Sequence, residues 1–201
     1  MRAFFLILLL LTISMTASAA VAPPGQVPIG PDQVLRGRFT QESQMKGSNI
    51  PIQSSGHFVL APAHGLIWNM EKPFPTSTII TPKGSVQDFG GVAVKLSIKN
   101  LRHLYEMIGG ALRGDWSGLE ADYIITPTVN TAHWQMLLTP RPDGKSKTPY
   151  ASITVDGSRF VEKIAMTKID GGVDTLDFTE EVLSPAPLTA NENLAFNEVG
   201  R

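Results

Sequence analysis

The four histidines of this 201-residue chain are its side chains best suited to metal or acid–base chemistry, and they are scattered: His57, His64, His103 and His133. No second histidine lies two, three or four positions after any of them, and the chain contains no cysteine. Zinc sites usually take ligands from closely spaced pairs of these residue types. The sequence therefore predicts no metal site.

Two short patterns could belong to a nucleophile or an acid–base pair. Ser43 and Lys46 have the S-x-x-K spacing, but that motif needs both residues on one helix face and companion motifs downstream, which are missing. Glu180 and Glu181 are adjacent in a predicted strand, so their side chains should point to opposite faces. The lipase elbow, the Walker loop, the dinucleotide fingerprint and H-E-x-x-H are also absent. We therefore expect neither an enzyme nor a cofactor.

Composition narrows the class of protein further. A formal net charge of −1 leaves no basic field to hold nucleic acid. Without cysteine the chain has neither a disulfide nor the acylated cysteine of a bacterial lipoprotein. A hydrophobic content of 42% with 17% charged residues is typical of an ordinary globular protein.

The first residues have the features of an export signal. Arg2 is followed by an apolar run over Ala3–Ile13 and by the A-x-A site Ala17-Ser18-Ala19. The run is shorter than the ~20 apolar residues that span a bilayer. We predict a cleaved signal peptide over 1–19, a proline-rich extended lead over 20–33 and one domain over 34–201, located in the periplasm.

The elements needed to position any binding site are mostly strands. Ser54–Pro73 contains two β-patterns whose alternate residues make one face unusually apolar. Spacing and turn residues predict ten strands: Val34–Met45, His57–Leu60, Leu66–Met70, Thr76–Thr81, Ser85–Asp88, Ala121–Thr126, Ala132–Thr139, Tyr150–Asp156, Phe160–Lys168 and Thr175–Glu181. One amphipathic helix is expected over Ile98–Leu112, with Gly109-Gly110 weakening its end.

This inventory favours a mainly β fold in which an antiparallel sheet curls around its apolar face. Such a face must be closed off or capped, and the helix is the available cap. If the helix covers the face only in part, the remaining space is an apolar pocket for a lipid or another hydrophobic ligand.

Three segments together resemble the periplasmic outer-membrane lipoprotein carrier family, LolA. They are Leu35–Gln41 (LRGRFTQ), Ser54–Pro73 and Trp134–Phe178, and the likeness extends over Val34–Glu181. The resemblance implies an incomplete β-barrel with a helical lid and an apolar cavity for acyl chains. It also implies a monomeric carrier that takes cargo from an inner-membrane ABC transporter to an outer-membrane acceptor without a cofactor.

The chain departs from the family pattern in three places. Ala61-Pro62 replaces an Arg-Pro whose arginine is understood to hold the lid shut, and Lys83–Phe89 lacks the second tryptophan. The proline-rich lead replaces a long N-terminal helix. These differences leave the cargo open, so a paralogue serving a specialised lipid-linked product fits as well as a general carrier.

Ten apolar residues are candidates for the acyl cavity, by alternation and by the resemblance. They are Phe39, Phe58, Leu60, Leu66, Trp68 and Met70 from the strands, with Ile98, Leu101, Tyr105 and Ile108 from the helix. Taken singly, each could be ordinary core. Two other functions remain open: a lipid or lipoprotein sensor with the same fold, and an enzyme acting on an acyl substrate.

Overall fold

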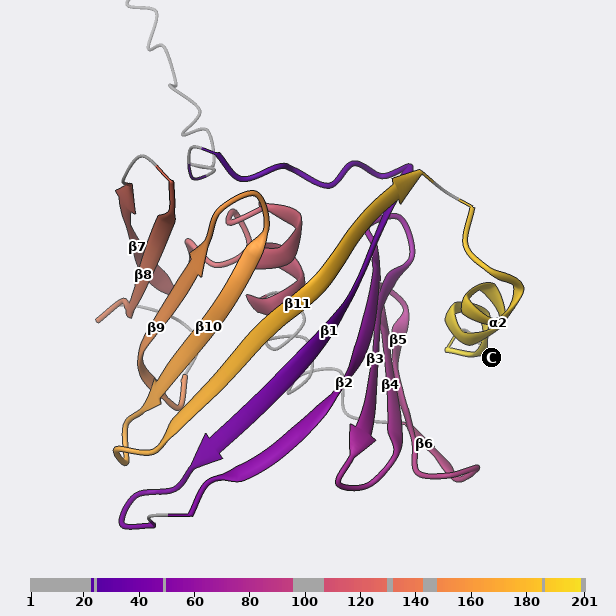
Figure 1. The fold of residues 1–201 in the computed structure, drawn as a ribbon, viewed down its shortest axis with the longest axis horizontal. Coiled ribbons are helices and arrows are strands. Elements are labelled where there is room, and N and C mark those ends of the chain that lie inside the picture. The colour runs from indigo at the N-terminus through magenta and orange to yellow at the C-terminus, as the bar shows by residue number, and fades with distance from the viewer. Residues whose placement is uncertain are drawn as a thin grey trace, which may run out of the picture.

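The protein is built on one open antiparallel sheet of eleven strands, which the computed structural model describes over residues 23, 25–48, 50–95, 107–129, 132–142, 148–185 and 187–199. The strands are β1 (Gln33–Gln44), β2 (Ile52–Ala61), β3 (Gly65–Lys72), β4 (Thr76–Thr81), β5 (Gly84–Asp88), β6 (Ala93–Lys95), β7 (Tyr123–Val129), β8 (Trp134–Pro140), β9 (Tyr150–Gly157), β10 (Val161–Lys168) and β11 (Val173–Pro185). They lie in the order β6-β5-β4-β3-β2-β1-β11-β10-β9-β8-β7 (Figure 1). The predicted fold class, a mainly β protein with an unclosed antiparallel sheet, is confirmed.

The strand bounds differ from the prediction where pairing extends a strand beyond its apolar pattern. β2 begins at Ile52 because Ile52 pairs with Ser43 of β1, and β11 continues to Pro185, which faces Gln33. The three-residue strand β6 was not predicted. The predicted signal peptide over 1–19 lies outside the described residues.

The centre of the sheet is the pairing of β1 with β11, two strands from opposite ends of the chain. Leu35 faces Leu183 and Phe39 faces Phe178. The two halves of the sheet, β2–β6 and β7–β10, are joined through this pair (Figure 1).

Alternation along the strands gives the sheet two apolar faces. The inner face, defined here as the one that packs against a helix over 107–113, contains the larger core, with Leu35, Phe39, Phe58 and Leu60 from β1 and β2. The outer face carries a second core, in which the intervening residues Val34, Val59, Ala61 and Ile67 are buried. Ala61 therefore faces away from the inner helix, so the missing arginine at this position does not bear on that face.

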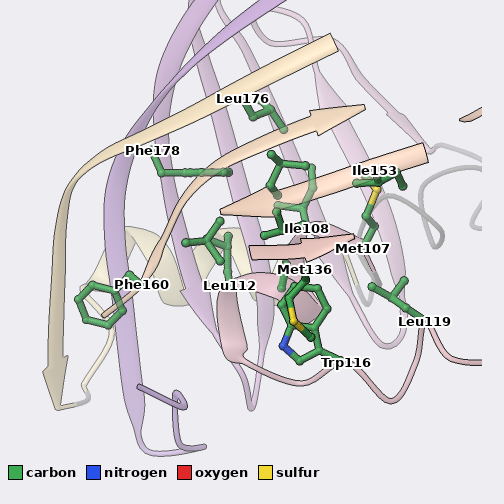
Figure 2. Packing of buried hydrophobic residues seen from close by; sticks show 14 of the residues in the cluster. Met107, Ile108, Leu112, Trp116, Leu119, Met136, Ile153, Phe160, Leu176 and Phe178 are labelled. Carbon is green, nitrogen blue, oxygen red and sulfur yellow. The ribbon is translucent and has the colours of Figure 1, made fainter. Parts of the chain in front are cut away.

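The helix over 107–113 is the described part of the predicted helix Ile98–Leu112, whose residues 98–106 lie outside the described residues. Ile108 and Leu112 point into the inner core together with Met136 and Ile153 from the strands (Figure 2). The helix continues through Gly109-Gly110, as the predicted end at Leu112 requires. Gly114 ends it at φ +76°, and the N–H groups of Gly114 and Asp115 donate to the carbonyls of Ala111 and Gly110 at 3.1 and 2.9 Å.

The N-terminal lead is fixed across the end of this helix (Figure 1). The N–H of Val27 donates to the Arg159 carbonyl at 2.9 Å, and the N–H of Ile29 donates to the Arg113 carbonyl at 3.1 Å. The Gln26 side chain donates to the Ala111 carbonyl at 2.6 Å and accepts from the Trp116 indole at 3.3 Å. The lead thus satisfies the last carbonyls of the helix, which would otherwise lack partners.

A second helix, α2 (Ala190–Glu198), covers the outer core and was not predicted (Figure 1). Phe196, Leu188 and Val199 pack with Val59 and Ile67 there. Thr189 and Glu192 form a capping box at the start of α2, and this T-x-x-E spacing is a sequence signal that could have revealed it. Within the described ranges, no helix is long and apolar enough to cross a bilayer.

Candidate functional site

Four aromatic side chains gather on the inner face at the centre of the sheet, and we call them the aromatic cluster: Phe39 of β1, Phe58 of β2, Trp68 of β3 and Phe178 of β11. Trp68 stacks on Phe39 with ring centroids 3.8 Å apart and an interplanar angle of 24°. Phe58 and Phe178 meet edge to face at 5.6 Å. Such pairs add stabilisation beyond that of the buried area alone.

Trp68 is the member of the cluster that remains partly exposed. Phe39 and Phe58 are each 1% exposed and Phe178 is 4% exposed, whereas Trp68 is only partly buried and packs against the inner core from its margin. Trp68 is thus a large apolar ring that stays partly in contact with water beside a buried aromatic layer. Such a ring offers a binding surface to an apolar ligand.

The structure places most of the ten candidate cavity residues on this face. Phe39, Phe58, Leu60, Leu66 and Ile108 lie in the inner core, with Leu60 directly opposite Leu66 in the register of β2 and β3. Met70 is partly buried two residues beyond Trp68 on the same strand. Ile98, Leu101 and Tyr105 lie outside the described residues. Contact of any of the ten with a ligand stays a prediction.

A β-bulge next to the aromatic cluster brings an acidic side chain to the same face. Arg36 faces Val182 and Arg38 faces Thr179, so Glu180 and Glu181 together oppose the single residue Gly37. Glu180 occupies the left-handed region at φ 55°. The side chains of Glu180 and Glu181 point to opposite faces of the sheet, as expected. The bulge determines which of the two points to the inner face.

Glu181 is the one that turns inward. A Cβ added at Gly37 would meet the Phe58 ring at 2.7 Å and the Cγ of Glu181 at 3.2 Å, which places the Glu181 side chain beside the aromatic cluster. Its Oε1 atom is buried and has no hydrogen-bond partner. Burial, with a smaller contribution from the charge of Glu162, raises the pKa of Glu181 to about 7. Sequence analysis missed both Glu181 and Phe178 as candidate site residues.

The other groups suited to chemistry are engaged elsewhere. On the outer face, His57 lies 2.9 Å from both Glu71 and Asn69, and His64 stacks on Phe196 of α2. The Ser43 hydroxyl donates to Asp174 at 2.7 Å. Among the residues that the structure describes, no group of three histidine, aspartate or glutamate side chains is arranged to hold a metal.

Two hollows lie along the described strands and are lined mainly by outer-face residues. One, of about 540 Å³, is lined by polar side chains that include Glu42, Gln53 and Lys72. The other, of about 430 Å³, lies between α2 and the sheet, where Arg36 donates to both carboxylate oxygens of Glu192 at 2.8 and 2.7 Å. The polar lining of the first hollow suits water or polar groups better than acyl chains, whereas the lining of the second also includes the apolar side chains Val59, Ile67 and Ala195.

Comparison with known proteins finds similarity in structure only. No family model matches the chain, and no curated protein matches it. Similar solved structures include a LolA superfamily protein from Nitrosomonas europaea, 11% identical with a TM-score of 0.47 over 81% of this chain and 90% of that chain. A chain of the Pseudomonas aeruginosa MucA/MucB complex is 14% identical, with a TM-score of 0.47 over 80% of this chain and 55% of that chain.

A third similar structure is a putative outer membrane lipoprotein-sorting protein domain from Vibrio parahaemolyticus. It is 9% identical, with a TM-score of 0.43 over 87% of this chain and 94% of that chain. At these identities each likeness concerns the fold alone.

Proposed function

We propose that this protein binds the acyl chains of a lipid or lipoprotein against the aromatic cluster on the inner face of its open sheet. The observation that carries the proposal is the partly exposed Trp68 stacked on the buried Phe39. A chain lying on Trp68 would continue the apolar surface of the inner core and would remove the exposed edge of the ring from water.

The energetics suit a carrier that must also release its cargo. At ~0.8 kcal/mol per buried methylene, a sixteen-carbon chain gains about 12 kcal/mol on leaving water. A bilayer offers nearly the same gain, so transfer between protein and membrane is close to balanced. Adaptable apolar contacts therefore allow both uptake and delivery.

Location and route are part of the same proposal. The signal-like residues 1–19 favour the periplasm. By the family resemblance, cargo would pass from an inner-membrane ABC transporter to an outer-membrane acceptor. The missing second tryptophan in Lys83–Phe89 keeps a specialised lipid-linked cargo within the proposal.

The test compares two neighbouring residues of β3 that face opposite sides of the sheet. Trp68→Glu places a charge on the inner face, and Asn69→Glu places the same charge on the outer face. We expect Trp68→Glu to abolish uptake of a fluorescent fatty acid and Asn69→Glu to retain it. Circular dichroism must show that both variants are folded. Undiminished uptake by folded Trp68→Glu would remove the aromatic cluster from the binding site.

A second measurement separates carriage from the alternatives. Protein loaded with labelled lipid is mixed with acceptor vesicles, and a carrier should pass the label on. Stable binding without transfer would favour a sensor, and hydrolysis of an acyl ester by the purified protein would favour an enzyme.

A further inference from the structure

The bulge between β1 and β11 reverses the direction of one charged residue. Phe178 points inward, so strict alternation would turn Glu180 inward and Glu181 outward. The extra residue reverses this order and directs Glu181 to the inner face, while Leu183 continues on that face. A non-glycine residue held at φ 55°, here Glu180, costs free energy that regular pairing would avoid.

The position opposite the bulge makes room for the redirected side chain. Residue 37 is glycine, and a larger residue there would overlap the Phe58 ring, whose Cε1 atom would lie 2.7 Å from its Cβ. The Phe58 ring and the Glu181 side chain therefore share the space above Gly37, which puts Glu181 close to where an acyl chain would lie on the aromatic cluster.

The Glu181 carboxylate lacks a hydrogen-bond donor. Its Oε1 atom is buried and receives no hydrogen bond. A buried polar atom without a partner is costly and calls for an explanation. A hydrogen-bond donor on the bound ligand would explain why the protein itself provides none.

The charged groups on the surrounding strands do not supply that partner. On β1, Arg36 pairs with Glu192 and Arg38 pairs with Glu71 at 2.7 Å, both on the outer face. On β10, Glu162 adds further negative charge, although it accepts from Ser158 and lies 3.8 Å from the His133 ring nitrogen. On β11, Glu180 is exposed.

We propose that Glu181 is a headgroup-recognition residue, which selects amphiphiles carrying a protonated amine next to the acyl chain. The proposal rests on the proposed function, because the chain must lie on the aromatic cluster for the amine to reach Glu181. An ammonium donates charge-assisted hydrogen bonds to the unpartnered oxygen, whereas an anionic headgroup is repelled by the carboxylate.

Three twelve-carbon probes that differ only in headgroup test the proposal: dodecylammonium, dodecanol and dodecanoate. At pH 8 we expect the wild-type protein to bind dodecylammonium at least tenfold more tightly than dodecanol, and dodecanoate more weakly than dodecanol. Glu181→Gln keeps the shape of the side chain and should bind all three probes with similar affinity. Glu180→Gln is the matched control and should retain the preference.

Lowering the pH provides a second readout that needs no variant. At pH 5.5 Glu181 becomes neutral while the alkylammonium stays charged, so the preference of the wild-type protein for the amine should disappear. Equal binding of all three probes by the wild-type protein at pH 8 would overturn the role of Glu181 and leave the acyl site standing. Failure of every probe to bind would overturn the proposed function itself.

Discussion

Neutralising Glu181 is expected to stabilise the protein at alkaline pH, with no ligand present. Glu181→Gln preserves the volume of the side chain and removes the charge that burial disfavours. In the wild-type protein the free energy of unfolding should fall as the pH rises from about 4.5 to about 7 and then stay level. In the variant this component of the pH dependence should be missing.

The size of the effect follows from the pKa of Glu181. Folding raises it from 4.5 to about 7, and each unit corresponds to about 1.4 kcal/mol, which gives about 3 kcal/mol for a fully buried group. The carboxyl is partly exposed, so solvent screening lowers the expected gain to about 1–2 kcal/mol. The sign is fixed because the carboxyl is neutral in both states at low pH, and only the folded state resists its ionisation at high pH.

Urea unfolding at pH 4.5 and pH 8 measures this difference. Glu71 and Glu192 have lowered pKa values from their arginine or histidine partners, so their stabilisation is lost as the pH falls. Both residues are common to the two proteins and cancel in the comparison. A variant no more stable than the wild type at pH 8 would show that Glu181 is solvated or paired, and would refute the reasoning.

The attachment of α2 gives two further predictions, both measured by urea unfolding. Phe196→Ala should lower the free energy of unfolding by about 3 kcal/mol, because it removes a buried ring from the outer core. Leu194→Ala, at a side chain that is 62% exposed, is the control, and equal losses in the two variants would contradict the packing described. Thr189→Ala should cost about 1 kcal/mol through loss of the N-cap hydrogen bond, and an unchanged stability would show that the cap does not contribute.

Local sequence patterns correctly predicted which residues of β2 and β3 share the inner face. Phe58, Leu60, Leu66 and Trp68 alternate with residues of the other face, and period-two spacing alone is enough to place them together. The turn at Ala61–Gly65 lies between these strands, so their pairing is local and needs no knowledge of the rest of the chain.

The pairing of β1 with β11 could not be predicted from local sequence patterns. Phe178 meets Phe58 only because the two ends of the chain pair, and sequence spacing carries no information about a contact over that separation. The direction of Glu181 depends on the bulge at Glu180, which overrides strict alternation. α2 has few apolar residues and so lacks the strong stripe by which the inner helix was predicted.

The central pairing also sets the order in which the molecule can fold. Arg36 and Ser184 meet across it at a separation of 148 residues, so β1–β6 and β7–β11 can form as local meanders before β1 pairs with β11. Until then each meander exposes an unpaired strand edge, the feature that promotes misassembly between chains. Arg36 and Arg38 place charges along the edge of β1 that is unpaired at this stage, and Gly37 interrupts the apolar character of that edge. We therefore expect the pairing of β1 with β11 to limit the rate of folding.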